Sequence, residues 1–311
     1  MIVTVTLNLA LDVTYRVPRL TPGATHRVAV EQRAGGKGVN VARVLTALGA
    51  DAVVCGFAGG GTGRVALAEL EAAGMPARTT PVASESRRTV AVVDTGAGEA
   101  TGFWEPGPGV TEGEWEALLR DVSAEFGRAS AAVLSGSLPP GVPAEAYAIL
   151  CERAARADVP VVLDADGDAL RRGLAGRPDV VKPNREELAG VAGTADVLEG
   201  AARVRELGAR SVVASLGADG VVAVTDDGSW RARPAHPAAG NPTGAGDAGV
   251  AALALGLARG WSWPERLTEA VALSAAAVSA PLAGSFDADA YRRQRDDVTV
   301  EALPMAAARE G

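Results

Sequence analysis

The sequence predicts an α/β protein: a three-layer αβα sandwich built on a largely parallel sheet. Short β-branched runs such as residues 2–7 alternate with amphipathic stretches such as 39–49 along most of the 311 residues. The strand-like runs are almost wholly apolar, as in strands covered on both faces of a sheet. Two segments, residues 13–34 and 78–105, instead alternate polar with apolar residues and contain turn signals. We expect these two segments to form a small projecting β-sheet that serves as a lid, the alternative being two ordinary surface hairpins.

Each expected element has a local signal of its own. The first strand reads "IVTVTL", and the first helix ends at Gly49, a typical C-terminal cap. A second helix is predicted in "GRVALAELEAAG", and a third in the apolar stripe of residues 115–126. The remaining strands are predicted in "AVVCGFA", "AAVLS", "VPVVLDA", "DVVKP", "RSVVASLG" and "GVVAVTD". Residues 1–311 are therefore expected to form one domain together with its lid.

Composition excludes several classes of function. The net charge of −8, without any basic run, argues against nucleic acid as a partner. The two cysteines, Cys55 and Cys151, form neither a metal-binding spacing nor a disulfide framework, which favours a reducing cytoplasm. No stretch has the length and apolar character of a membrane span. We expect a cytoplasmic protein that acts on small molecules.

Lysine and asparagine are scarce, and their positions are informative. Only two of the 30 basic residues are lysine, and the chain has four asparagines. These six residues are Lys37, Lys182, Asn8, Asn40, Asn184 and Asn241. Codon bias in a GC-rich genome explains the scarcity, but all six lie in loop motifs, where a substitution by arginine or aspartate would have been easy. Their positions therefore indicate a requirement for these side chains.

The stretch "AGGKGVNVARVL" places paired glycines at the start of a helix. Such a start leaves backbone N–H groups open to an anion, and the helix dipole adds its positive end. Lys37 supplies a cation there, and Asn40 can bind a polyol. The spacing is not that of a P-loop. A plain glycine turn that opens a helix is the alternative interpretation.

Two other loops follow predicted strands, where ligands of open α/β sheets collect. In "SGSLPPGVP", Ser137 offers a hydroxyl group, although this signal is weak on its own. In "VVKPNREEL", Asn184 and Glu187 are three residues apart and could hold the waters of a magnesium ion as outer-shell ligands. The same pair also fits a helix-capping box, which leaves both interpretations open.

The stretch "NPTGAGDAGV" has the G-x-G-x-x-G spacing of a dinucleotide-binding turn at Gly244, Gly246 and Gly249. The residues before it are rich in proline and predict no strand, and Asp247 inside the turn would repel a pyrophosphate. Phosphoryl transfer explains the pattern better. The N–H groups of residues 244–246 would stabilise the phosphoryl group in flight, while Asp247 takes the proton of the attacking hydroxyl.

Five motifs in this order resemble the ribokinase/PfkB family of carbohydrate kinases across nearly the whole chain. They are "AGGKGVNVA", "SGSLPPG", "KPNREEL", "SLGADGVV" and "NPTGAGD". Further stretches resemble the branch that acts on phosphorylated hexoses, which includes 1-phosphofructokinases and tagatose-6-phosphate kinases: "TLNLALD", "HRV", "ESRRTVAVV" and "EPGPGVT". The resemblance implies a ribokinase-like, Rossmann-type fold with a β-lid, ATP as phosphoryl donor and Mg²⁺ as helper. It also implies that a homodimer could form through the lid.

The resemblance implies conversion of fructose 1-phosphate to fructose 1,6-bisphosphate. A tagatose-6-phosphate or fructose-6-phosphate kinase is an alternative, as is a kinase of a non-phosphorylated sugar or nucleoside. A catalytically idle sensor of sugar phosphates is a third class. Asp247 matches the catalytic base and residues 244–246, including Ala245, the anion hole.

The other matching positions divide between acceptor and nucleotide. Lys37 and Arg87 match the positions that grip the acceptor's existing phosphate, with Arg27 as a third candidate. The expected acceptor-binding residues are Asp12, Arg27, Gly36, Lys37, Asn40, Arg87 and Ser137. The expected residues on the nucleotide side are Asn184, Glu187, Ser215, Gly217 and Gly220.

The sequence departs from the family pattern at four places. Leu9 stands where the family has proline, and His26, Thr89 and Trp104 stand where it has asparagine. Trp104 removes a polar group from the lid and could change the preferred sugar. These departures leave the residues of phosphoryl transfer in place.

Overall fold

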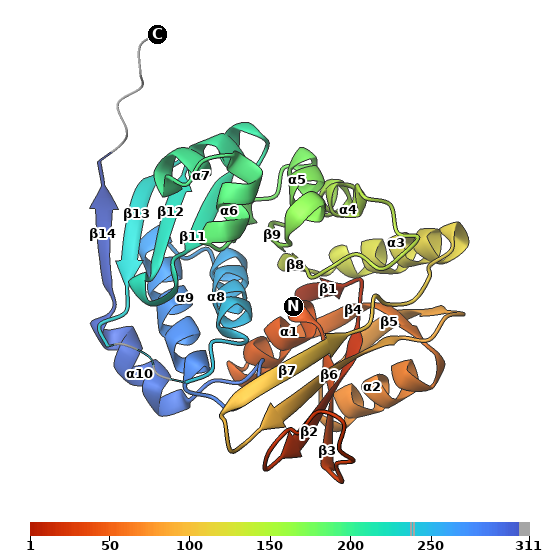
Figure 1. The fold of residues 1–311 in the computed structure, drawn as a ribbon. Coiled ribbons are helices and arrows are strands. Elements are labelled where there is room, and N and C mark those ends of the chain that lie inside the picture. The colour runs from red at the N-terminus through yellow and green to blue at the C-terminus, as the bar shows by residue number, and fades with distance from the viewer. Residues whose placement is uncertain (237, 239, 305–311) are drawn as a thin grey trace.

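The computed structural model describes residues 1–236, 238 and 240–304 and contains two β-sheets (Figure 1). The main sheet has ten strands in the order β14-β13-β12-β11-β10-β9-β8-β1-β4-β5. Their bounds are β1 Ile2–Thr6, β4 Ala52–Gly59, β5 Ala77–Val82, β8 Ala131–Ser135, β9 Val161–Asp164, β10 Val180–Val181, β11 Ser211–Ser215, β12 Val221–Thr225, β13 Gly228–Arg233 and β14 Thr299–Leu303.

The strand order of the main sheet reverses at β1. From β5 to β11 neighbouring strands are parallel, and β12, β13 and β14 continue the sheet in antiparallel pairs. The chain moves outward from β1 through β4 to β5, and then returns to β8 on the other side of β1. In an open α/β sheet the crevice beyond the carboxyl ends at such a reversal is where ligands bind.

Helices cover both faces of the main sheet. One hydrophobic core joins the sheet to α1, α2, α8 and α9, and a second joins its other face to α3, α4, α5, α6 and α7. The helices are α1 Lys37–Ala47, α2 Gly60–Ala72, α3 Glu112–Phe126, α4 Ala146–Ala155, α5 Gly167–Gly173, α6 Arg185–Ala192, α7 Val197–Glu206, α8 Ala245–Arg259, α9 Trp263–Val278 and α10 Ala288–Asp297. The predicted three-layer α/β architecture is confirmed. Among the described residues, no helix is both long and apolar enough to cross a bilayer.

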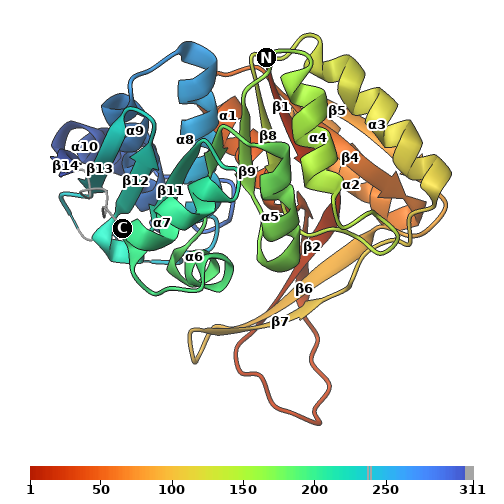
Figure 2. The same cartoon turned by 90° about the horizontal axis from the view of Figure 1, so that it is seen from above.

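The second sheet is the lid, and it projects from the main body (Figure 2). Its four strands are ordered β3-β2-β6-β7. They are β2 Ala10–Val17, β3 Ala29–Gly35, β6 Arg87–Asp94 and β7 Glu99–Trp104. The predicted segment 78–105 is too long by one strand, because β5 pairs with β4 in the main sheet. Its polar–apolar alternation is that of an edge strand, which the sequence pattern did not separate from the lid.

The two faces of the lid differ in character. Asp12, Arg33 and Thr89 are register partners and share one face, whereas Val13 and Phe103 belong to the opposite face. Helix α2 packs against the opposite face near its base, where Val13 is 4% exposed. Further out along this face nothing in the described chain covers Phe103, which is 60% exposed.

Candidate active site

Asp247 lies in the first turn of α8, and its side chain is buried beside α1. The residue is 8% exposed, and Asn40 Nδ2 of α1 donates a 2.8 Å hydrogen bond to Asp247 Oδ2. Burial raises the pKa of the Asp247 carboxyl to about 7, and the negative charge of Asp164 adds to the rise. The Asn40 hydrogen bond opposes it. A carboxylate with a pKa near neutrality is suited to act as a general base.

The start of α8 is open to a ligand. Gly244 is the N-cap at φ +89°, and a Cβ atom there would stand 2.7 Å from the Cα of Ala283, so only glycine fits. No side chain caps the helix. The Ala245 N–H donates to the carbonyl of Pro242 at 3.1 Å. Of the predicted anion hole, the exposed Gly246 therefore offers a free first-turn amide, and the next N–H, that of Asp247, adjoins it.

Two lysines flank a buried carboxylate next to this amide pair. Asp164, at the end of β9, is 3% exposed and lies 3.7 Å from Lys37 Nζ and 3.6 Å from Lys182 Nζ. Lys182 Nζ is also 3.5 Å from the position that a Cβ on Gly246 would take. Burial acts to lower the pKa of Lys37, but Asp164 and Glu187 raise it overall. The two lysines outnumber the one carboxylate that they share, and the Lys182 ammonium lies next to Gly246 in the anion hole.

Neither Asp164 nor Lys182 was among the predicted site residues. Lys182 carried a signal, because it is one of only two lysines in the chain. Asp164 carried none: it stands in the acidic run "LDADGD", and its importance arises from two lysines that are distant in sequence.

Asp12 lies on the lid strand β2, and its carboxylate has polar and charged neighbours from β3, β6 and α1. The hydroxyl of Thr89 donates a hydrogen bond to the Asp12 carboxylate, and a Cβ on Gly35 would overlap that carboxylate. Burial raises the pKa of Asp12, while the Thr89 hydrogen bond and the charge of Arg87 oppose the rise. The side chain is positioned to accept hydrogen bonds from a polyol.

Asn8, in the segment after β1, is hydrogen-bonded to three other parts of the chain. Its side-chain amide donates 3.0 Å hydrogen bonds to the carbonyl of Pro106 and to Ser137 Oγ. The backbone carbonyl of Asn8 accepts a 3.0 Å hydrogen bond from Arg87 Nε. Arg87 thus lies near Gly36, because a Cβ atom on Gly36 would stand 3.8 Å from that same carbonyl oxygen. Asn8 thus links Ser137 and Arg87 beside the glycine loop, and their role in binding the acceptor stays a prediction.

Lys37 and Arg87 begin close together but turn to different partners. The Lys37 ammonium faces Asp164, whereas the Arg87 guanidinium lies by Asn8. That Lys37 and Arg87 together bind one phosphate of the acceptor stays a prediction. Arg27 lies exposed in the loop before β3, and no hydrogen bond or ion pair of the described residues joins it to Lys37 or Arg87.

Asn184 and Glu187 form the capping box of α6. Asn184 Oδ1 accepts from the Glu187 N–H, and Glu187 Oε2 accepts from the Asn184 N–H, both at 2.8 Å. The capping role does not exclude a role in holding the waters of a magnesium ion, because each side-chain oxygen retains a free lone pair. One carboxylate and one amide near the lysine cluster fit a magnesium ion that keeps most of its waters and binds phosphate oxygens. No group of three acidic, histidine or cysteine side chains among the described residues forms a metal cage.

The other expected nucleotide-side residues lie next to this box. Ser215 and Asn184 pair in a short parallel bridge, so β11 ends beside the start of α6. The loop then turns through Gly217, at φ +63°, to Gly220, at φ +82°. A Cβ on Gly220 would stand 2.0 Å from the carbonyl of Ala232, so the tight turn requires glycine. This explains the "LGADG" pattern as a backbone feature.

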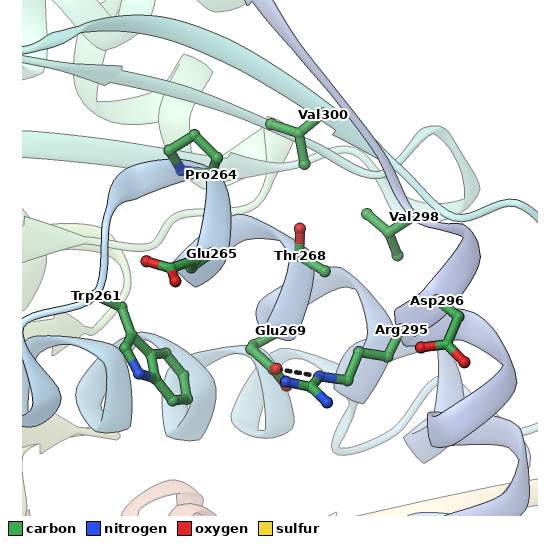
Figure 3. Close-up of a pocket in the computed structure, with 9 residues that line it drawn as sticks. All are labelled: Trp261, Pro264, Glu265, Thr268, Glu269, Arg295, Asp296, Val298 and Val300. Atoms are coloured by element: carbon green, nitrogen blue, oxygen red, sulfur yellow. Dashed lines mark hydrogen bonds and ion pairs between the residues drawn. The ribbon is translucent and has the colours of Figure 1, made fainter.

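A hollow of about 470 Å³ lies on another part of the molecule, between α9, α10 and β14 (Figure 3). Two of its three acidic groups have partners. Glu269 binds Arg295 and the hydroxyl of Tyr291, and Glu265 caps α9 through Ser262. The third is Asp296. None of the expected site residues lines this hollow, so we do not assign it as the catalytic site.

The sequence matches the model of the pfkB family carbohydrate kinases over residues 4–289. The chain belongs to this family. The pfkB assignment confirms the prediction of a carbohydrate kinase, and it accounts for a carboxylate, open amides and lysines at one point of the fold.

Three pfkB relatives illustrate the similarity. The chain is 36% identical to 1-phosphofructokinase of Escherichia coli strain K12 over 293 residues, 92% of this chain and 93% of that protein. It is 35% identical to ATP-dependent 6-phosphofructokinase isozyme 2 of Mycobacterium tuberculosis strain H37Rv over 288 residues, which are 90% of this chain and 84% of that protein. The tetrameric inhibited form of phosphofructokinase-2 from Escherichia coli has a TM-score of 0.85 and 30% identity, covering 95% of this chain and 98% of that one. This agreement confirms the ribokinase-like fold. Both of the first two relatives are named phosphofructokinases, but one name specifies position 1 and the other position 6, at nearly equal identity.

Proposed function

We propose that the protein is an ATP-dependent kinase of a hexose monophosphate, with fructose 1-phosphate as acceptor and fructose 1,6-bisphosphate as product. One observation carries the proposal: Asp247, held by Asn40, adjoins the open amides of α8 and the Lys182 ammonium. A base and an anion hole must be neighbours, because the oxygen that loses its proton attacks the phosphorus that the amides face. The two matched phosphofructokinases support a phosphorylated hexose as the acceptor class.

The transfer step follows from this arrangement. The acceptor hydroxyl gives its proton to the Asp247 carboxylate, and its oxygen forms a bond to the γ-phosphorus of ATP. The bond between that phosphorus and the β–γ bridging oxygen breaks, and ADP leaves with the electron pair. The amides of Gly246 and Asp247, together with Lys37 and Lys182, stabilise the charge on the equatorial oxygens.

The acceptor is oriented by groups on the lid side of the cleft. Asp12 accepts hydrogen bonds from the sugar hydroxyls, and Asn40 on α1 is hydrogen-bonded to the base Asp247. Arg87 binds the existing phosphate, because a guanidinium fits phosphate oxygens bidentately and is always charged. Arg87 lies on the lid strand β6, whereas Lys37 and Lys182 pair with Asp164 at the end of β9, so the existing phosphate and the one being transferred have separate cations.

Magnesium fits the nucleotide side of the site. Glu187 and Asn184 would hold its water shell, and the ion would neutralise charge on the β- and γ-phosphates. Ser215 and the glycine turn at residues 217–220 lie beside them and would receive the nucleotide. The two cysteines are buried and form no disulfide bond with each other, as is typical of proteins in a reducing compartment, and this supports a cytoplasmic location for the reaction.

A coupled ADP-release assay over a panel of acceptors tests the proposal. The panel contains fructose 1-phosphate, fructose 6-phosphate, tagatose 6-phosphate, fructose, ribose and a nucleoside, each with Mg²⁺ and ATP. We expect the highest kcat/KM with fructose 1-phosphate. Turnover confined to the non-phosphorylated compounds would overturn the hexose-phosphate assignment. Binding of a sugar phosphate without any ADP release would indicate a sensor instead.

We further propose that the protein forms a homodimer through the lid. The face opposite Asp12 carries Val30 at 51% exposure and Phe103 at 60%, together with half-buried Tyr15 and Val92. An apolar sheet face of this kind is normally covered by a partner. The matched phosphofructokinase-2 has a tetrameric inhibited form. Sedimentation velocity of the wild type and of Val30→Glu tests the proposal: we expect a dimer or larger assembly that the variant dissociates, and a wild-type monomer would contradict it.

A further inference from the structure

Four residues form a straight row across the inner face of the lid. Arg33 on β3 is the register partner of Asp12 on β2, and Asp12 is the partner of Thr89 on β6. Thr89 is in turn the partner of Trp104 on β7. Directly opposed residues on neighbouring strands project from the same face. The hydrogen bond between Thr89 and Asp12 confirms this for the centre of the row. Trp104 therefore shares a face with Asp12.

This face is turned toward the site on the main body. Arg33 Nη1 donates a 3.0 Å hydrogen bond to the carbonyl of Ala283. Ala283 in turn packs on Gly244, the residue that opens α8 beside Asp247. The row that ends in Trp104 thus begins at the loop that supports the anion hole. A molecule bound between the lid and α8 faces all four side chains.

The indole of Trp104 has one covered and one open surface. Its Cε2 and Cζ2 atoms are 3.4 Å from the position of a Cβ on Gly102, so the ring lies along β7 over a residue without a side chain. The partner of Gly102 on β6 is Ala91, which leaves this part of the face nearly flat. Trp104 is nevertheless 78% exposed, the highest fraction among the exposed large hydrophobic residues described. A large aromatic surface left in water is costly unless a ligand covers it.

Phe103 shows that this exposure is specific to a face. It precedes Trp104 on the same strand and is 60% exposed, but it projects to the opposite side, with Val90 as its register partner. That side is the apolar face for which we propose a dimer contact. The two neighbouring aromatic residues thus serve two different surfaces, and substitutions at them can be compared directly.

Resting on the proposed function, we infer that Trp104 determines acceptor specificity by stacking on the C–H face of the sugar that Asp12 holds. Asp12 and Trp104 are two strand spacings apart, roughly 10 Å between backbones, which leaves room for a sugar ring above Thr89 between them. An indole surface favours an acceptor that presents C–H bonds and disfavours one that presents a hydroxyl group, because the hydroxyl would lose its hydrogen bonds to water. Trp104 therefore selects among hexose monophosphates that differ in hydroxyl configuration on the side facing the lid.

Steady-state kinetics of Trp104→Ala, with Phe103→Ala as the matched control, test the inference. We expect Trp104→Ala to raise KM for the preferred sugar phosphate by about 3- to 10-fold, the range of one aromatic packing contact, with KM for ATP unchanged. In Trp104→Ala, the ratio of kcat/KM for the best acceptor to that for the second-best acceptor should be smaller than in the wild type. Phe103→Ala should leave both KM values unchanged when assayed at a concentration where sedimentation shows the wild-type assembly. An unchanged acceptor KM and ratio in Trp104→Ala, or equal effects of the two substitutions, would overturn the inference.

Fluorescence gives a second readout that does not depend on turnover. Addition of the sugar phosphate without ATP should change the tryptophan emission of the wild type, and this change should be lost in Trp104→Phe although four other tryptophans remain. A change of equal size in Trp104→Phe would contradict stacking. If the acceptor panel identifies a different acceptor class, the hexose-phosphate assignment is wrong, but the same titration with that acceptor still decides whether Trp104 contacts it.

Discussion

Asn40 Nδ2 lies 2.8 Å from Asp247 Oδ2, so a side chain of the glycine-loop helix α1 is hydrogen-bonded to the first turn of α8. The bond stabilises the ionised carboxylate, whereas burial and the charge of Asp164 destabilise it. The Asn40 hydrogen bond and the charge of Asp164 therefore shift the pKa of Asp247 in opposite directions. Removing one or the other by substitution should change the pH dependence of activity in opposite directions.

The activity should rise with pH as Asp247 loses its proton. Below the pKa of about 7, we expect kcat/KM of the wild type to fall about tenfold per pH unit, because only the ionised carboxylate accepts a proton. Asn40→Ala should shift this bend to higher pH, since it removes an interaction that lowers the pKa of Asp247. Asp164→Asn should shift it to lower pH, since it removes a negative charge. Shifts of both variants in the same direction would contradict the assignment.

Replacement of the base itself should reduce turnover without weakening binding. We expect Asp247→Asn to lower kcat by roughly 10²- to 10⁴-fold, with modest changes in both KM values, because the base acts in the transition state. The amide is isosteric and keeps the contact with Asn40, so thermal unfolding should show no loss of stability. A variant with near wild-type kcat would mean that another group takes the proton.

Arg87 should act on one substrate only. We expect Arg87→Ala to raise KM for the sugar phosphate by about 10- to 100-fold, the effect of a lost charge-assisted hydrogen bond, and to change KM for ATP much less. Arg88→Ala is the matched control. Arg88 is the next residue on β6, is exposed and pairs with Glu105 at 2.8 Å, so its removal should leave both KM values unchanged. Equal effects of Arg87→Ala on the two substrates would exclude a role as phosphate clamp.

The fold could be predicted largely because its central strands are buried on both faces. Runs such as those of β1, β8 and β9 are apolar and β-branched, and the helices between them have a clear apolar stripe. The edges of the sheet were harder to predict. Strands β13 and β14 carry polar, partly exposed residues and were not anticipated as strands, and β5 was assigned to the lid.

The candidate site was predictable where its chemistry is local in sequence. The glycine turn before Asp247 and the Asn184–Glu187 pair both carry short patterns with a physical reason. Asp164 became a site residue only through folding, because its partners Lys37 and Lys182 come from α1 and from the end of β10. The lid row that joins Asp12 to Trp104 likewise depends on strand register, which no local pattern reveals.

Glu187 should govern the magnesium requirement separately from its structural role. Glutamine is accepted at the third position of a capping box, so Glu187→Gln should keep the hydrogen bond to Asn184 and the stability of α6 while removing the charge. We expect the variant to need about tenfold more free Mg²⁺ for half-maximal activity at saturating ATP, with an unchanged Tm. Glu114→Gln is the control, because Glu114 and Thr111 form the same capping box on α3. It should alter neither quantity. An unchanged Mg²⁺ response of Glu187→Gln would assign the pair to helix capping alone, and magnesium would then be held by the phosphates and other residues.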